Sequence, residues 1–419
     1  MRRVLIIVLI IVAIWAGLWF FYFKPKQATT GVSPVPNVLK PFFPVSTSTG
    51  GSFGSDTIPG VVGNTSNATT PGAPSPFTQL TGHPVAGYTI FDLTNKVSIP
   101  STDPKKKPTV QTVTDHYIRY VSRQNGYVYE IKDSGTPLQI TNIFIPNIYE
   151  AQFADSNTTA LLRFLRNDSE TIATYSVPIP SLNNDGTRTQ KTGTFLPDNI
   201  LELAVSPDQT QLARVTVDNS GSIVTTSTSL GTKIKAIAKS PFVEWLPFWV
   251  KNTVYLQTKA ASIANGFLYK IDSSTARLSR ALGDIPGLTV SMSPSGTYIL
   301  YSQSTGTGFS TSIFNTKTNT TNNLSLSIMP ENCAWLQNED LICGGGNTVK
   351  NATYPDDWYA GVVHFSDQLY KISTKSNTYT VLYNNSGQSF DMTTLKVDEN
   401  QHLLYFIDKN TGYLWQFSY

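Results

Sequence analysis

The stretch that decides the fold of this chain is Val290-Ser291-Met292-Ser293-Pro294-Ser295-Gly296-Thr297-Tyr298-Ile299-Leu300-Tyr301. It predicts two strands joined by a tight turn. Apolar residues lie on both sides of the Ser-Pro-Ser-Gly segment, and Ser, Pro and Gly are the residues that turns favour. One hairpin is weak evidence for any fold, but this hairpin recurs along the chain, and the recurrence predicts the architecture.

Seven hairpins of this kind can be placed by the last apolar residue before each turn. These positions, which we call anchors, are Val113, Phe153, Val205, Trp245, Met292, Trp335 and Val397. Successive anchors are 40, 52, 40, 47, 43 and 62 residues apart. A period of about 40 to 50 residues with several strands per unit is typical of β-propeller blades. Seven copies argue against chance hairpins, so we predict an all-β fold, a seven-bladed β-propeller over residues 85–419.

Further strands follow each anchor. Segments such as Leu403–Ile407, Gly266–Asp272 and Thr378–Tyr383 alternate apolar and polar residues, as strands with one face in a core do. The last anchor leaves room for only two more strands, so the final blade lacks its outermost strand. We expect the unassigned segment 87–93 to complete it, because such closure protects sheet edges that an open ring would expose.

The charge pattern excludes a nucleic-acid-binding role. The chain carries a net charge of +3, with 31 basic and 28 acidic residues. Four of the basic residues, Arg2, Arg3, Lys24 and Lys26, flank an N-terminal apolar run. Without these four, 27 basic residues face 28 acidic ones, a net charge of −1. The body of the protein therefore lacks the basic surface that nucleic acids require.

The N-terminal apolar run, Val4–Phe23, predicts a transmembrane anchor within residues 1–26. It has twenty residues without a charge, enough to span a hydrocarbon core of roughly 30 Å. A buried helix of the folded domain and a long, cleaved signal peptide are the alternatives. The few cysteines and the many Asn-x-Ser/Thr triplets favour a single-pass plasma-membrane protein whose C-terminal domain lies outside the cytoplasm.

Residues 27–84 are rich in Ser, Thr, Gly and Pro, as in Ser46–Ser52 and Thr69–Pro76. Such a composition cannot bury enough apolar surface to offset the ordering of the chain. We expect a flexible spacer, stiffened by its prolines, between anchor and propeller. Asn64 and Asn67 begin triplets that fit N-glycosylation.

The propeller region resembles the seven-bladed propellers of the Tol-system periplasmic (TolB-like) family. Ser206-Pro207-Asp208 and Ser293-Pro294-Ser295-Gly296 are similar to that family's S-P-D-G turn, whereas the other five units depart from it. The resemblance implies the propeller fold and a place outside the cytoplasm. It transfers no partner, because propellers host unrelated functions.

Two cysteines, Cys333 and Cys343, lie on the two arms of the sixth hairpin. Residues placed on adjacent strands in this way can face each other across the hairpin. Outside the cytoplasm we predict a disulfide between them, the alternative being two buried thiols. No histidine lies at ligand spacing from them, so we predict no metal at this position.

The longest spacing reflects an insertion, residues 344–367, between the second and third strands of the sixth unit. In propellers such loops lie on the face that carries the blade-to-blade connections and the mouth of the central channel. Aromatic rings and carboxylates there would suit sugar or peptide contact. The candidate ligand-binding residues are Tyr354, Asp356, Asp357, Trp358, Tyr359 and His364. The alternative is a self-packed loop whose rings cover the blade.

No pattern predicts a catalytic centre, a cofactor or a metal site. Asp356 and Asp357 are adjacent, so on a strand they would point to opposite faces rather than share a substrate. The four histidines, His83, His116, His364 and His402, are scattered and form no visible triad with Ser and Asp. Lys105-Lys106-Lys107 predicts a solvated loop tip, with contact to anionic polymers as its alternative.

These observations favour a membrane-anchored, extracytoplasmic propeller that acts as a binding or scaffolding module in the cell envelope. Its partners would be the membrane, through the N-terminal helix, and an envelope protein, peptide or surface polymer. The alternative is a glycan-active hydrolase or lyase with carboxylates at the channel mouth, and the missing acid/base constellation disfavours it. A sensor or assembly factor acting through a membrane partner is a third possibility.

Overall fold

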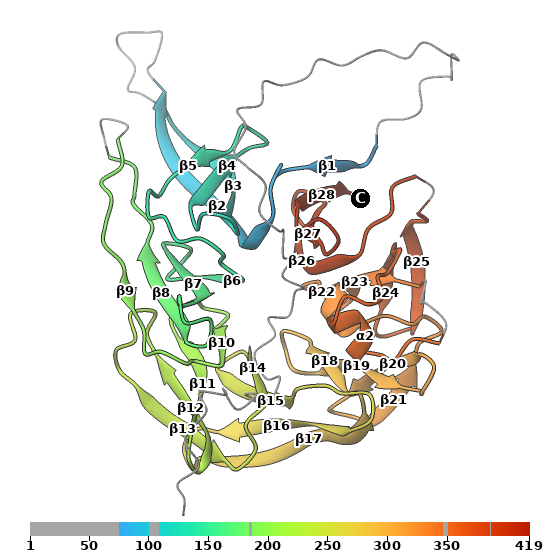
Figure 1. Ribbon diagram of the computed structural model, residues 1–419. Helices are drawn as coiled ribbons and strands as arrows, with labels where there is room; N and C mark the ends of the chain where they lie inside the picture. Colours follow the sequence, from blue (N-terminus) through green and yellow to red (C-terminus); the bar gives the residue numbers. More distant parts are fainter. Residues whose placement is uncertain (1–74, 100–108, 184–186, 347–350, 386) are drawn as a thin grey trace, which may run out of the picture. The chain divides into compact units, whose positions relative to one another are not determined.

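A computed structural model describes residues 75–99, 109–183, 187–346, 351–385 and 387–419. These ranges contain seven antiparallel four-stranded sheets. The sheets follow one another around a central axis as the blades of a propeller (Figure 1). The predicted all-β seven-bladed propeller is therefore confirmed.

In each blade the chain runs from the innermost strand outward, except in the last. The first four blades comprise β2 (Val85–Ile99), β3 (Thr109–Ser122), β4 (Val128–Lys132) and β5 (Leu138–Gln139); β6 (Glu150–Ala154), β7 (Thr159–Leu165), β8 (Ile172–Pro178) and β9 (Thr194–Phe195); β10 (Glu202–Val205), β11 (Leu212–Asp218), β12 (Gly221–Ser227) and β13 (Lys235–Ser240); and β14 (Trp245–Val250), β15 (Thr253–Thr258), β16 (Asn265–Asp272) and β17 (Arg277–Pro286).

The last three blades comprise β18 (Thr289–Met292), β19 (Tyr298–Ser304), β20 (Phe309–Asn315) and β21 (Thr320–Asn323); β22 (Cys333–Trp335), β23 (Leu341–Gly345), β24 (Gln368–Ser373) and β25 (Thr378–Tyr383); and β26 (Met392–Asp398), β27 (Leu403–Asp408), β28 (Leu414–Ser418) and β1 (Phe77–Gln79). Two short helices complete the described elements, the 3-10 helix η1 (Pro330–Asn332) and α2 (Asp356–Tyr359). In these ranges no helix is long and apolar enough to cross a membrane. The predicted anchor Val4–Phe23 lies outside them.

The core lies between blades, because each blade has a neighbour on both faces. In β19, Leu300 packs into the cluster shared with the sixth blade, whereas Ile299 and Tyr301 pack into the cluster shared with the fourth. Successive residues of a strand point to opposite faces, so one strand serves both clusters. Each of the seven blade-to-blade seams has such an apolar cluster in the described chain.

The two Ser-Pro turns have the same hydrogen bonds. The Ser293 N–H donates to the Tyr298 carbonyl at 2.9 Å, and the Gly296 N–H donates to the Ser293 carbonyl at 2.8 Å. In the third blade, the Ser206 N–H donates to the Gln211 carbonyl at 2.9 Å, and the Gln209 N–H to the Ser206 carbonyl at 2.8 Å. The fourth turn position is left-handed in both, with φ of 79° at Gly296 and 60° at Gln209. A shared motif therefore gives one shared turn geometry.

The ring is closed by β1, not by the segment 87–93 as the sequence predicted. Phe77, Thr78 and Gln79 pair with Phe417, Gln416 and Trp415 of β28 (Figure 1). The segment 87–93 belongs to β2, the innermost strand of the first blade. The closing strand does come from the N-terminal side, but it begins within the predicted linker. The propeller thus includes residues from 77 onward, and the expected boundary at 84/85 is wrong.

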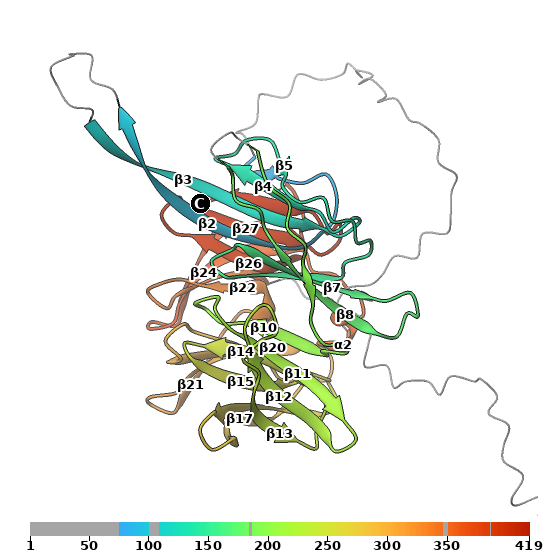
Figure 2. The same cartoon turned by 90° about the vertical axis from the view of Figure 1, so that its left-hand side faces the viewer.

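Two of the seven anchors are also wrong. Val113 lies inside β3, because β2 and β3 form a hairpin much longer than the blade, which projects from the disc (Figure 2). Trp245 begins β14 instead of ending it, and the turn follows Val250. Pro247, a residue type that favours turns, lies instead inside this innermost strand, whose free edge has no neighbouring strand to accept a hydrogen bond.

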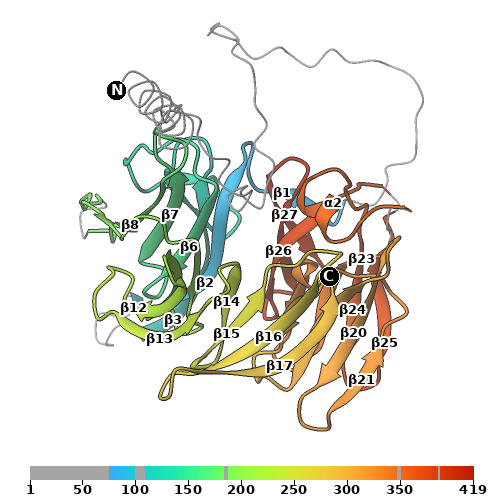
Figure 3. The ribbon, with the colours of Figure 1, turned by 60° about the horizontal axis from the view of Figure 1, so that its bottom comes forward.

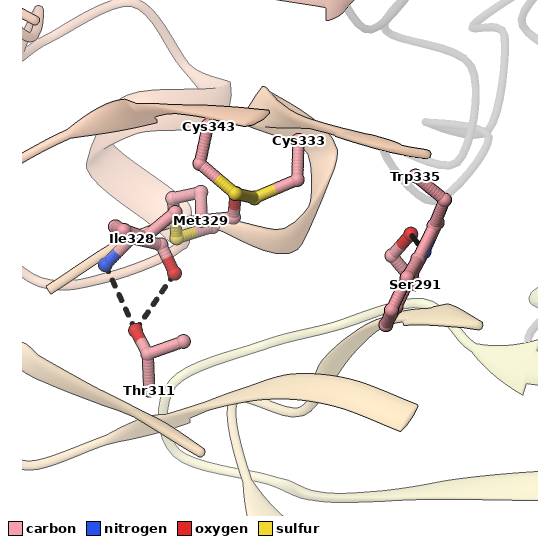
Figure 4. Close-up of a disulfide and its surroundings, with 7 residues drawn as sticks. All are labelled: Ser291, Thr311, Ile328, Met329, Cys333, Trp335 and Cys343. Atoms are coloured by element: carbon pink, nitrogen blue, oxygen red, sulfur yellow. Dashed lines mark hydrogen bonds between the residues drawn. A yellow bond between two sulfur atoms is a disulfide. The ribbon is translucent and has the colours of Figure 1, made fainter. Parts of the chain in front are cut away.

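The predicted disulfide is present. Cys333 and Cys343 are register partners on β22 and β23, and their Cα atoms are 4.1 Å apart. Nearby, the Trp335 indole N–H donates to the Ser291 hydroxyl at 2.9 Å, and the Thr311 hydroxyl donates to the Ile328 carbonyl at 2.7 Å (Figure 4). The Trp335–Ser291 bond joins the sixth blade to the fifth, and the Thr311–Ile328 bond ties the connecting segment to the fifth, so the covalent link stiffens a blade already tied to its neighbour.

Candidate functional site

The insertion of the sixth blade packs against the fifth blade through its aromatic rings. It joins β23 to β24 as predicted and carries α2 at one end of the blade's strands (Figure 3). Tyr354 and Trp358 are 1% and 3% exposed, and they pack with Phe309, Met329 and Phe365. These two rings have no free surface to offer a ligand. Their burial favours the alternative in which the rings of Tyr354 and Trp358 cover the blade, and ligand contact by these two residues stays a prediction.

The acidic residues of the insertion accept hydrogen bonds that hold the insertion in place. The Asp356 carboxylate accepts a hydrogen bond from the Ser262 N–H of the fourth blade at 2.7 Å. The Asp357 carboxylate accepts one from the Thr353 N–H at 2.7 Å. The two carboxylates, which lie on α2 and not on a strand, therefore have separate hydrogen-bond partners. The Tyr359 hydroxyl donates to Glu331, whose pKa is raised by burial.

The insertion is also tied to the last blade, through Asp391. This buried carboxylate accepts from the Trp358 indole N–H at 3.1 Å and from the Phe365 N–H at 3.2 Å. Burial raises the pKa of Asp391, while Lys409 opposes the shift. His364 lies on the surface with its Nδ1 atom 3.4 Å from Asp391. His364 is one of the six predicted binding residues, and because it is exposed it remains a candidate for ligand contact.

A charged cluster that the sequence did not predict lies at the channel mouth. Glu150 and Glu202 are the first residues of the innermost strands β6 and β10, so they lie on the face of the disc that carries the insertion. Both carboxylates reach one guanidinium group, that of Arg163 on β7: Glu150 pairs with its Nη1 atom, and Glu202 lies 3.9 Å from the same atom. The side chains of Glu150 and Glu202 are 29% and 36% exposed.

Arg163 is fixed and buried, whereas the carboxylates of Glu150 and Glu202 are partly exposed. Its Nη2 atom donates to the carbonyls of Ile200 and Leu201 at 2.9 and 2.7 Å. One cation therefore serves two carboxylates and cannot neutralise both. Burial in the channel wall raises the pKa of Glu202 to about 7, an effect that Arg163 opposes and Glu150 reinforces. Near neutral pH, Glu202 can accept a hydrogen bond or donate a proton.

A further ion pair lies on the next blade at this face of the disc. Glu244 directly precedes β14 of the next blade, and its carboxylate lies 4.0 Å from the Lys259 ammonium group. Three carboxylates, Glu150, Glu202 and Glu244, thus face two cations, Arg163 and Lys259. Partly exposed groups at a channel mouth experience a stronger field than groups on a flat surface. The mouth is suited to a ligand that brings hydrogen-bond donors or positive charge.

A second cluster lies at the seam of the first and last blades. His116 on β3 has its Nδ1 atom 2.8 Å from Asp92 of β2 and 3.2 Å from Asp398 at the end of β26. Its Nε2 atom lies 3.0 Å from the Tyr405 hydroxyl on β27. The sequence showed four scattered histidines, because this group draws on both ends of the chain. The register pair of Asp92 and His116 could have been found only by recognising the long hairpin.

One cavity in the described chain is smaller than a typical ligand site. The space between the third and fourth blades, lined by Lys235, Trp249 and Asn252 among others, has a volume of about 220 Å³. Small-molecule sites commonly have volumes of about 300 to 1,000 Å³. The cavity therefore carries no ligand assignment, and the clusters described above remain the candidate sites.

Comparison with known proteins gives only distant likenesses among solved structures. No protein-family model matches the chain, and no curated protein matches it. Among solved structures, TolB from Acinetobacter baumannii is 10% identical over 72% of this chain and 81% of its own, with a TM-score of 0.39. The β-propeller domain of the Trilobed protease from Pyrococcus furiosus is 9% identical over 72% and 91%, with a TM-score of 0.47.

Oligogalacturonate lyase from Vibrio parahaemolyticus is 9% identical over 78% of this chain and 97% of its own, with a TM-score of 0.46. These neighbours differ in what their names describe. A likeness this distant agrees with a propeller fold and says nothing about activity, ligand or partner.

Proposed function

We propose that this chain is a binding module whose ligand docks at the channel mouth on the face that carries the insertion. The observation behind the proposal is the pair Glu150 and Glu202 on the single guanidinium group of Arg163. Above about pH 7, where Glu202 is ionised, two carboxylates with one buried cation leave negative charge that a ligand can neutralise. The ligand class that fits is a peptide or protein segment presenting a Lys or Arg side chain to the mouth.

A glycan-active hydrolase is the second candidate. It is favoured by the geometry that places two carboxyl groups, Glu150 and Glu202, at one guanidinium group, where burial raises the pKa of Glu202 to about 7. Glycosidases use two carboxyl groups in this way, one kept protonated as the general acid and one kept ionised. The two candidates share residues but differ in what Glu202 does, so they can be separated by experiment.

The test of the binding role uses the full-length chain and a labelled oligolysine peptide, with an acetylated copy of the peptide as the uncharged probe. Fluorescence anisotropy should show binding of the charged peptide that weakens as salt is added. The Glu150→Gln/Glu202→Gln variant should bind at least tenfold more weakly. Glu170→Gln, a matched change at an exposed site in the same blade, should bind as the wild type does.

Equal binding by wild type and double variant, or equal binding of charged and acetylated peptides, would contradict the proposed site. The hydrolase candidate is tested on labelled oligosaccharides. Turnover that disappears in Glu202→Gln and persists in Glu170→Gln would replace the binding role by catalysis.

We further propose that residues 1–26 anchor the chain in the plasma membrane and that the propeller lies outside the cytoplasm. The apolar run Val4–Phe23 and the disulfide Cys333–Cys343 support this arrangement, since disulfides persist in oxidising compartments. An epitope placed after Tyr419 should be removed by protease added to intact cells. An epitope that is cleaved only after cell lysis would contradict the orientation.

A further inference from the structure

The seam between the first and last blades carries a group of side chains that fits a metal ion. The Nδ1 atom of His116 and one carboxylate oxygen each of Asp92 and Asp398 all lie within 4.8 Å of one another. An imidazole nitrogen with two carboxylate oxygens is a ligand set suited to Zn²⁺ and related transition ions. We propose that these three residues bind a divalent transition-metal ion, Zn²⁺ being the best fit, and thereby link the two ends of the propeller.

The spacing of the three atoms supports the proposal. Two ligands of a tetrahedral Zn²⁺ ion, each about 2.0 to 2.1 Å from it, lie about 3.3 Å apart. The His116 nitrogen is 3.2 Å from the Asp398 oxygen and 2.8 Å from the Asp92 oxygen. The first distance already fits, and the second has to open by about half an ångström. Asp92 can move in this way, because its side chain is 38% exposed.

The atoms behind the ligands hold them in a binding orientation. The Nε2 atom of His116 lies 3.0 Å from the Tyr405 hydroxyl, so its N–H can donate there while Nδ1 remains free for the ion. The Oδ1 atom of Asp398 accepts from the N–H groups of Asn400 and Gln401, both at 3.0 Å, which leaves Oδ2 pointing to His116. Metal-binding histidines and carboxylates usually have such supporting hydrogen bonds.

Charge gives a further reason for a divalent ion. A neutral imidazole with two carboxylates carries a charge of −2, and a divalent cation cancels it. Without the ion, both carboxylates share the single N–H that Nδ1 can carry. Asp398 is only 8% exposed, so an unbalanced charge there is costly. The exposed side of Asp92 lets the ion enter and leaves room for water at the remaining positions.

The ligands come from the two blades that close the ring. Asp92 and His116 lie on β2 and β3 of the first blade, and Asp398 lies at the end of β26 in the last. A bound ion therefore adds a cross-link at the seam where strands from the two ends of the chain meet. The site is separate from the channel-mouth carboxylates, since β26 ends at Asp398 whereas Glu150 and Glu202 begin their strands.

The test is a titration of the tag-free full-length chain, first treated with a chelator, against Zn²⁺ in competition with a chromophoric zinc indicator. The wild type should bind one Zn²⁺ per chain, and Ca²⁺ at the same concentration should not displace it, because Ca²⁺ prefers oxygen ligands. His116→Ala should lose this ion. His364→Ala, the matched control, should keep it, because His364 has a single carboxylate beside it.

Two milder variants keep the test decisive if His116→Ala fails to fold. Asp92→Asn and Asp398→Asn preserve shape and hydrogen bonding and remove one charged ligand each, so each should weaken Zn²⁺ binding at least tenfold. Zn²⁺ should also raise the melting temperature of the wild type and of His364→Ala, and leave that of His116→Ala unchanged. No Zn²⁺ bound to the wild type, or unchanged affinity in both Asn variants, would overturn the proposal.

Discussion

The sixth and seventh blades both depart from the regular repeat, and they do so in opposite ways. The sixth has a local fastener, a disulfide between residues ten apart, and an insertion that packs against the fifth blade and hydrogen-bonds to the fourth and the last. The seventh is completed from the other end of the chain, by the three residues of β1. A local fastener can be removed without opening the ring, whereas loss of β1 exposes a sheet edge. We therefore expect the smaller element, β1, to have the larger effect on stability.

The largest effect is expected for Phe77→Ala. Phe77 is buried between the last two blades and contacts the rings of Tyr383, Phe390, Phe406 and Phe417. Truncating a buried phenylalanine costs about 3 to 5 kcal/mol of unfolding free energy. Denaturant unfolding should show this loss, and Thr78→Ala, an exposed change in the same strand, should cost about 0.5 kcal/mol or less. Equal costs for both variants would mean that β1 does not hold the ring closed.

The disulfide of the sixth blade should contribute less. It closes a short loop, for which the loss of chain entropy in the unfolded state gives about 2 to 3 kcal/mol. Cys333→Ala/Cys343→Ala should lower the free energy of unfolding by that amount, and a reducing agent should do the same to the wild type. The same reducing agent should leave the double variant unchanged. A cost above that of Phe77→Ala would reverse the ranking of the two blades.

The bond between the insertion and the last blade should have a smaller effect again. Trp358→Phe keeps an aromatic ring but removes the indole N–H that donates to Asp391. A buried carboxylate that loses one of its donors costs about 1 to 2 kcal/mol. Urea unfolding should show this cost, whereas Tyr379→Phe on the outer strand β25, where the ring is 44% exposed, should show almost none. No cost for Trp358→Phe would mean that the insertion is not fastened through Asp391.

The smallest effect is expected at the channel mouth, and it depends on pH. The pKa of Glu202 is about 7 in the folded chain and about 4.5 in a free glutamate. The folded state therefore holds more protons between these values, and this group's contribution to stability is lost as pH rises from about 4.5 to 7. Glu202→Gln should stabilise the protein at pH 8 and have no effect below pH 4.5.

For Glu202→Gln we expect the free energy of unfolding at pH 8 to rise by about 1 kcal/mol. This is well below the free energy that the whole pKa shift would correspond to, because the side chain of Glu202 is more than one third exposed and water screens it. Thermal unfolding of both proteins at pH 4, 6 and 8 measures it. Glu170→Gln, at an exposed site, should show no such pH dependence. A gain that is the same at all three pH values would contradict the raised pKa of Glu202.

The sequence predicted what local chemistry determines. The Ser293–Gly296 turn, the pairing of Cys333 with Cys343 and the position of the insertion all depend on neighbours in the chain. The predictions that were wrong concern features that depend on residues far away in the sequence. β1 has three residues, two of them exposed, and nothing in its pattern marks it as a strand. Val113 was misplaced because the hairpin of β2 and β3 outgrows its blade.

The candidate sites likewise combine sequence neighbours, which can be predicted, with residues far apart in the sequence, which cannot. Glu150 and Arg163 are register partners on adjacent strands, but Glu202 joins them from the next blade. His116 meets Asp398 only because the ends of the chain pair. The burial of Tyr354 and Trp358 depends on residues of the fifth blade, Phe309 among them, that no local pattern connects to the insertion. Sites at the seams between blades combine residues that are far apart in the sequence, so the sequence alone does not predict them.

Closure of the last blade by β1 is the claim on which this comparison depends, and a cross-link tests it directly. Thr78 and Gln416 are register partners on β1 and β28, so cysteines at these two positions should form a disulfide. Peptide mass mapping of unreduced Thr78→Cys/Gln416→Cys should find residue 78 linked to residue 416. In Ile90→Cys/Gln416→Cys the two thiols should stay free. A link from 416 to 90 and none to 78 would show that the segment 87–93 closes the ring, and would contradict the account.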